Sequence, residues 1–200
     1  EKIKDYLNNN RKKIITIILT IILILVGYFV YLEINKKNKI KIANNYNKAK
    51  INYISGDKSN VKNELINIVN EKDKTYSPLA LYFLIDNKIL IDKNKINKFF
   101  DILINKTDLE KEIKNLVIYK KAVFNSDFET ENNLIKILNP IINSNSIWKA
   151  HSLYLMAEYF YFKNEKEKSK EFFNQILNLE NVNPSIKLEA QRRLNRDFSD

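Results

Sequence analysis

Nineteen consecutive residues near the start of the chain, from position 14 to position 32, carry no charge and read IITIILTIILILVGYFVYL. At about 1.5 Å per residue they would form a helix of roughly 28 Å, which matches the hydrocarbon core of a bilayer. Tyr28 and Tyr31 lie near one end of the run, where amphipathic rings prefer the headgroup level. The run therefore predicts a transmembrane helix, and it leaves residues 41–200 to fold as a water-exposed domain.

The flanks of this run favour an uncleaved anchor over a cleaved signal peptide. The run exceeds a usual signal-peptide core, and the sequence EINK follows it where a cleavage site would need small residues. We expect a basic N-terminal segment over 1–13, the anchor over 14–32, a basic stem over 33–40 and the folded domain over 41–200. Lysines flank both ends of the anchor, so the positive-inside rule does not orient it. The stem lysines have two open interpretations, contact with anionic headgroups or a plain connection.

The folded domain is predicted to be all-α. The chain has only two Gly and three Pro, too few turn formers for a β sandwich or barrel. Apolar residues recur instead at helical spacing, as at Ile96, Phe99, Phe100, Leu103 and Ile104. We expect four helical hairpins and a terminal helix, over about 41–55, 59–71, 78–91, 94–105, 108–125, 129–142, 146–163, 165–179 and 184–198.

Helix start signals agree with this partition. Ser77-Pro78 and Asn183-Pro184 each place a capping residue before a first-turn proline, and Thr107 with Glu110 has the spacing of a capping box.

The last hairpin carries the clearest repeat pattern. Ala157 has a small side chain where two helices would approach closely, and Ser169 takes a position where Ala is commoner. The pattern comprises Leu153, Met156, Ala157, Phe160, Asn164, Ser169, Phe173 and Ile176. This spacing resembles the tetratricopeptide repeat, which implies an α-solenoid of stacked hairpins.

The repeat period persists weakly elsewhere. Ala190 follows Ala157 by 33 residues, and Ala49 precedes Gly56 by the seven residues that separate Ala157 from Asn164. Between Ala80, Ala122 and Ala157 the intervals are 42 and 35 residues. We expect a degenerate array, and for the middle hairpins ordinary helix packing explains the alanines equally well.

The basic N-terminus, single span, lysine-rich stem and degenerate repeats ending in YLMAEYFYFKNEKEKSKEFFNQIL together resemble a bacterial single-pass family, the ancillary SecYEG translocon subunits (YfgM-like proteins). The resemblance covers nearly the whole chain, although repeat positions record packing and not activity. It implies an inner-membrane protein with a cytoplasmic N-terminus and a periplasmic domain. It also implies the SecYEG translocon and periplasmic chaperones as partners.

No catalytic, cofactor-binding or metal-binding constellation is found in the sequence. His151 is the only histidine and cysteine is absent, so histidine-pair and cysteine-based sites are excluded. Residues 41–200 carry half of the net charge of +10, and there the signs are interspersed without a basic-aromatic motif, which argues against nucleic-acid binding. We therefore expect a non-catalytic protein without cofactor. An anchored enzyme with a site spread across several helices is a remote alternative.

Protein binding is the expected function, because first helices of stacked hairpins usually line the concave surface. The candidate partner-binding aromatics are Tyr82, Phe83, Tyr119, Trp148, Tyr154 and Tyr161, although a core role for nearly all of them is the competing interpretation. The residues expected to pack the repeats are Ala49, Gly56, Ala157, Phe160, Ser169, Phe173 and Ala190. The leading hypothesis is an adaptor that holds chaperones or emerging clients near the translocon. The alternative is an assembly factor for another envelope complex.

Overall fold

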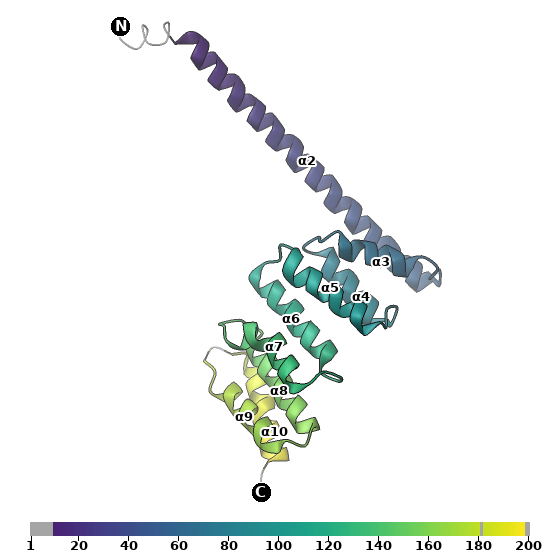
Figure 1. Cartoon of the computed structure of the whole chain (residues 1–200), viewed down its shortest axis with the longest axis vertical. Coiled ribbons are helices and arrows are strands. Elements are labelled where there is room, and N and C mark those ends of the chain that lie inside the picture. Colours follow the sequence, from purple (N-terminus) through teal and green to yellow (C-terminus); the bar gives the residue numbers. More distant parts are fainter. Residues whose placement is uncertain (1–9, 181, 199–200) are drawn as a thin grey trace. The chain divides into compact units, whose positions relative to one another are not determined.

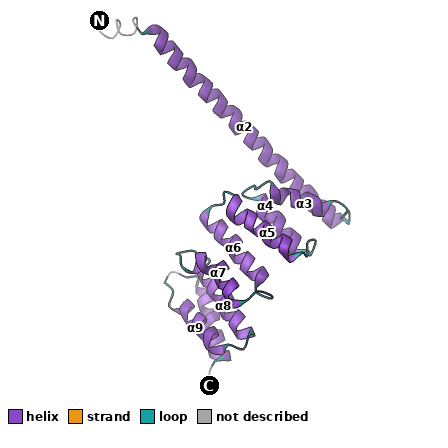
Figure 2. Ribbon diagram, viewed as in Figure 1, coloured by secondary structure: helices purple, strands orange, loops and turns teal. Residues whose placement is uncertain are grey.

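The computed structural model describes residues 10–180 and 182–198, apart from the side chain of Ile14. Within these ranges every regular element is an α-helix and no strand occurs (Figure 2). The predicted all-α fold is therefore confirmed. Residues 1–9, which make up most of the predicted basic N-terminal segment, lie outside the described residues.

The chain divides into two compact units, Glu1–Val61 and Lys62–Asp200. The described helices follow one another along the chain in the order shown in Figure 1. They are α2 (Arg11–Ser55), α3 (Val61–Asn70), α4 (Tyr76–Asp86), α5 (Lys93–Lys106), α6 (Lys111–Asn125), α7 (Glu131–Ile142), α8 (Lys149–Phe162), α9 (Lys166–Leu177) and α10 (Pro184–Asp197).

Helix α2 is continuous over 45 residues and joins the apolar run, the predicted stem and the first predicted repeat helix. The expected helix start near Lys41 is therefore wrong. The physical reason is that no proline or glycine interrupts residues 33–55, so nothing breaks the hydrogen-bond ladder. The helix ends at Gly56, whose φ of 91° suits a left-handed C-cap.

The first half of α2 is long and apolar enough to cross a membrane, and its apolar side chains are exposed in the folded chain. Two threonines within it satisfy their hydroxyls on the helix backbone. Thr16 Oγ1 donates to the Lys12 carbonyl at 3.0 Å, and Thr20 Oγ1 donates to the Thr16 carbonyl at 2.9 Å. Neither threonine hydroxyl therefore needs a partner outside the helix.

From α4 onward, each helix packs against the next one along the chain, and α8 also contacts both α6 and α10. The even-numbered helices α4, α6, α8 and α10 begin at Tyr76, Lys111, Lys149 and Pro184, which are 35, 38 and 35 residues apart. This period is more regular than the alanine intervals suggested. Ala80 lies near the start of its helix and Ala122 near the end of its helix, so the two are not equivalent positions.

Helix starts agree only partly with the predicted capping signals. Asn183 accepts a hydrogen bond from the Ser185 amide at 2.9 Å, which confirms the predicted cap of α10. Ser77 instead lies inside α4, buried, and donates to the Ile68 carbonyl at 2.6 Å, which ties α4 to α3. Thr107 follows the end of α5, and α6 begins only after Glu110, so the predicted capping box is wrong.

The α8–α9 hairpin is closed by the small residues that the repeat pattern singled out. Ala157 is fully buried, and its carbonyl accepts a hydrogen bond from Ser169 Oγ at 2.8 Å. Phe160 and Phe173 are buried around this crossing, and Ala190 of α10 is buried against the same cluster as Ala157 and Phe173. Asn164 at the turn has a φ of 61°, a left-handed conformation that asparagine tolerates. Ala49 of α2, which lies far from this hairpin in the sequence, is fully buried as well.

Replacing Ala157 with Leu should test the close crossing of α8 and α9. Overpacking a filled core site costs about 1–3 kcal/mol, so the melting temperature of the full chain in detergent should fall clearly. Asn174→Leu, on the exposed side of α9, is the matched control and should leave the melting temperature nearly unchanged. Equal effects of the two substitutions would contradict a tight crossing at Ala157.

A second prediction concerns the apolar half of α2. Arginines in place of Leu23 and Val26, near its middle, should each cost about 2.5–3.5 kcal/mol of insertion free energy. The wild-type chain should float with liposomes and resist extraction at alkaline pH, whereas the L23R/V26R chain should be extracted. Retention of the variant in the membrane fraction would show that α2 is not what holds the chain there.

Candidate functional site

The helices α5, α7 and α9 expose a wholly polar side. Because successive residues of a helix are about 100° apart, positions two before a buried residue and two, five and nine after it lie on the opposite side of the helix. Applied to Ile96, Leu134 and Ser169, this rule selects one outward stripe on each helix. All of its members are polar or charged and exposed: Asn94, Lys98, Asp101, Asn105, Asn132, Lys136, Asn139, Asn143, Glu167, Glu171, Asn174 and Asn178.

The outward sides of α4, α6 and α8 differ, because they carry exposed apolar side chains beside polar ones such as Asp86 and Lys120. Leu79, Ile113 and Val123 have exposed fractions of 40%, 43% and 41%, and Phe162 reaches 87%. We call this surface the even-helix face, made of Leu79, Tyr82, Ile113, Leu116, Lys120, Val123, His151, Leu155, Glu158 and Phe162. A helix side that is apolar opposite its own buried stripe is a sign of a binding surface.

Contacts between helices show that these three outward sides are neighbours. Lys120 Nζ of α6 lies 5.6 Å from the ring centre of Tyr82 on α4. Tyr119 of α6 stacks on Trp148 at the start of α8, with ring centres 5.7 Å apart, and meets the ring of His151 edge-on at 6.0 Å. The even-helix face is therefore one surface across α4, α6 and α8.

All six aromatic residues predicted to bind a partner are half-buried. Three of them, Tyr82, Tyr119 and Trp148, lie where neighbouring helices of the even-helix face meet. Burial raises the pKa of the Tyr82 and Tyr119 hydroxyls. Tyr154 and Tyr161 pack instead toward α10. The structure thus brings together the aromatics of α4, α6 and the start of α8, and it separates them from the two near α10.

The ring of Tyr161 is engaged within the fold. It lies edge-on to Phe198 at 5.8 Å, and the Arg193 guanidinium carbon lies 4.8 Å from its ring centre. Tyr154 similarly meets Phe173 at 5.3 Å, and burial, followed by the charge of Glu158, raises its pKa to about 12. Tyr161 is therefore not the freely outward side chain that the sequence suggested, and Tyr161→Ala would remove packing as well as surface.

Sequence reasoning missed the aliphatic members of the even-helix face. The signal was present in α6, where Ile113, Leu116 and Val123 follow helical spacing opposite the buried Ile118 and Ala122. A helix with two apolar stripes needs two apolar environments. The periodicity of α6 therefore indicates this second stripe, although none of its three members is aromatic.

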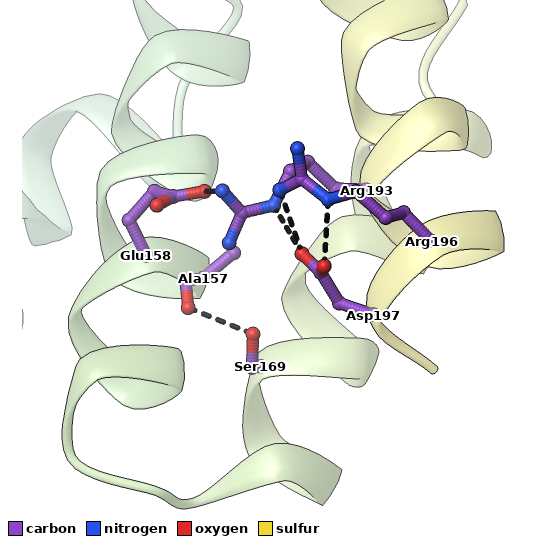
Figure 3. Close-up of polar contacts among 6 residues, drawn as sticks. All are labelled: Ala157, Glu158, Ser169, Arg193, Arg196 and Asp197. Atoms are coloured by element: carbon purple, nitrogen blue, oxygen red, sulfur yellow. Dashed lines mark hydrogen bonds and ion pairs between the residues drawn. The ribbon is translucent and has the colours of Figure 1, made fainter. Parts of the chain in front are cut away.

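An ion-pair cluster ties α10 to α8 at one end of the face (Figure 3). Arg193 of α10 contacts Glu158 of α8 at 3.0 Å and Asp197 of its own helix at 2.7 Å, and its side chain is only 13% exposed. Arg196 holds the other side of the same Asp197 carboxylate at 2.7 Å. Arg193 therefore links α10 to α8 as well as bonding within α10.

A further polar contact joins α6 to the α7–α8 loop. Glu112 accepts hydrogen bonds from Ser146 Oγ at 2.7 Å and the Ile147 amide at 3.2 Å, which fixes the α7–α8 loop.

The described residues hold no group of three His, Cys, Asp or Glu side chains placed to bind a metal ion. A hollow of about 760 Å³ lies between the α7–α8 and α9–α10 loops and is bordered by Trp148 and His151.

Comparisons with known proteins add no relative. No family model, curated protein or solved structure matches this chain.

The Asp197 cluster predicts a pH-dependent contribution to stability. A hydrogen bond from Arg196, helped by the charge of Arg193, lowers the pKa of Asp197 below its ordinary value near 3.8. A lowered folded-state pKa stabilises the fold above the ordinary pKa, and this contribution is lost as pH falls through the lowered value. The melting temperature of the wild type should therefore exceed that of Asp197→Asn at pH 7. The difference between the two melting temperatures should shrink below about pH 4.

Thermal unfolding of the two full-length chains, compared at pH 7, 5, 3 and 2, measures this difference directly. Other groups titrate equally in both chains, so they cancel in the comparison. A difference that stays constant across this range, or is absent at pH 7, would contradict the assigned ion pairs.

Proposed function

We propose that this chain is a membrane-anchored, non-catalytic adaptor whose helical domain binds other proteins through the even-helix face. The observation that carries the proposal is the contrast between its two sides. The outward stripes of α5, α7 and α9 are polar, whereas those of α4, α6 and α8 expose Leu79, Ile113, Val123 and Phe162. Exposed apolar side chains that recur on the outward sides of successive helices mark a place where another molecule can bind.

The arrangement of the helices supports a tetratricopeptide-like solenoid within this proposal. Contacts of α8 with α6 and α10, together with helix starts 35 to 38 residues apart, are what stacked hairpins would produce. Two polar contacts also join positions about one such interval apart, because Lys74 bonds to Asp108 and Ser146 bonds to Glu112, in both cases 34 residues apart. In such an array the first helices present a continuous binding surface.

The mode of binding follows from the side chains on the face. Partly exposed aliphatic groups gain about 25 cal/mol per Å² of apolar surface removed from water when a partner covers them. The rings of Tyr119 and Trp148 are already held by stacking, so little side-chain freedom is lost when they are covered. A preformed apolar surface of this kind suits an apolar segment of another protein.

The proposed anchor makes weak binding useful. The long apolar part of α2 supports attachment to a membrane, and restriction to a membrane raises the effective concentration of nearby partners. We propose that the membrane is the bacterial inner membrane, with the helical domain in the periplasm. The proposed partners are the SecYEG translocon and periplasmic chaperones or emerging clients. This part of the proposal rests on the architectural resemblance described for the sequence.

The test is purification of the tagged full-length chain from native membranes in mild detergent, followed by mass spectrometry. Ile113→Asp with Val123→Asp places two carboxylates on the even-helix face. The matched control, Asn94→Asp with Asn105→Asp, places two carboxylates on the polar side of α5. Translocon subunits or periplasmic chaperones should copurify with the wild type and the control, and should drop at least about tenfold with I113D/V123D.

Melting temperatures of the three chains separate lost binding from lost folding. Unchanged capture by a folded I113D/V123D chain would show that the even-helix face is not the docking surface. Enrichment of a different envelope complex, lost in the same variant, would keep the face and overturn the assignment to the translocon.

A further inference from the structure

The most one-sided charge in the chain lies on α2, directly after its apolar half. Residues 34–56 contain six lysines and no aspartate or glutamate. Four of these, Lys36, Lys37, Lys39 and Lys41, follow the apolar run closely, and all four are exposed. The carboxylate nearest along the chain is Glu33, which lies 3.7 Å from Lys37 in a pair whose side chains are 57% and 74% exposed. Such a loose, solvated pair competes weakly for the lysine.

The continuity of α2 determines where these lysines would lie beside a bilayer. Lys36 and Lys41 are four and nine residues beyond Leu32, about 6 and 14 Å along the helix axis. The headgroup layer on each side of the hydrocarbon core is about 5–8 Å thick. Lys36, Lys37 and Lys39 would therefore start within or beside this layer, and Lys41 just outside it.

Side-chain direction in a helix favours this end of the span over the other. Each Cα–Cβ bond of an α-helix tilts toward the N-terminus. Lysines that follow the apolar run therefore reach back toward the bilayer, and their long stems extend that reach. Arg11, Lys12 and Lys13 precede the run, so the same tilt points them away from the bilayer.

The four lysines also surround the helix. At about 100° per residue, Lys37, Lys39 and Lys41 lie roughly 100°, 300° and 140° around the axis from Lys36. Some ammonium group therefore faces the headgroups whichever way the helix is rotated. Exposed Tyr28 and Tyr31 lie at this same end of the run, where aromatic rings mark the membrane interface.

We propose that Lys36, Lys37, Lys39 and Lys41 form a collar that binds the phosphates of anionic phospholipids in the leaflet next to the C-terminal end of the apolar run. This inference rests on the membrane anchoring proposed above. It adds a preference for anionic headgroups, because an apolar helix alone does not distinguish one lipid headgroup from another. The collar would concentrate anionic lipid around the point at which α2 leaves the bilayer.

The test compares lipids in contact with the full-length chain in mixed vesicles. Spin-labelled phosphatidylglycerol and phosphatidylcholine report the lipid fraction whose motion the protein restricts. Wild type should prefer phosphatidylglycerol by roughly fivefold or more, and high salt should reduce the preference. In K36Q/K37Q/K39Q/K41Q the ratio should fall close to one. The matched variant R11Q/K12Q/K13Q should keep most of the preference.

The possible outcomes separate the two proposals. If neither lipid is restricted by the wild-type chain, α2 is not inserted, and the anchoring fails together with the collar. If both lipids are restricted equally, the anchor stands and the collar is overturned. An equal loss of preference in the two variants would also overturn the assignment to Lys36–Lys41, because it would show no advantage for the C-terminal end of the run.

Discussion

The fold of the compact unit Lys62–Asp200 depends on one constraint, that each helix must bury an apolar stripe against its neighbours. Where the stripe carries a small residue, two helices approach closely. Ala157 and Ser169 provide this contact between α8 and α9, and the Ser169 hydroxyl is satisfied by the Ala157 carbonyl at 2.8 Å. Because each helix packs mainly on its neighbours in sequence, the domain grows as an ordered array around clusters shared by successive helices.

Each helix in such an array also has an outward side, opposite its buried stripe. The chemistry of this outward side differs between α5, α7 and α9 and the helices α4, α6 and α8. On α5, α7 and α9 that side is polar and its residues are exposed. On α4, α6 and α8 it carries aliphatic and aromatic groups together with Lys120, His151 and Glu158. Four of the apolar groups, Leu79, Ile113, Val123 and Phe162, stay exposed although the buried stripes already hold the helices together. They therefore supply the physical basis for assigning a binding role to this side.

Charged groups act at the two ends of the described chain in different ways. Near the C-terminus, Arg193 is largely enclosed and is paired with Glu158 and Asp197, so its charge holds α10 in place. Along α2 the lysines after the apolar run are exposed and almost without carboxylates nearby. A charge that is enclosed and paired contributes to holding the fold together. Exposed charges without nearby opposite charges can instead attract another molecule. The net charge of +10 alone does not separate these roles.

Local information in the sequence was enough for the helical class, the long apolar run and most helix positions, because spacing and breakers act within a few residues. It also located the buried residues of the α8–α9 hairpin. Capping at Thr107 and Ser77 was mispredicted because both side chains bond to distant or preceding carbonyls, which local patterns do not reveal. Only the tertiary structure decided that Tyr161 packs under Arg193, that Tyr119 stacks on Trp148, and that the outward sides of α4, α6 and α8 form one surface. Those outcomes depend on which helices become neighbours, and that is set by packing across the whole domain.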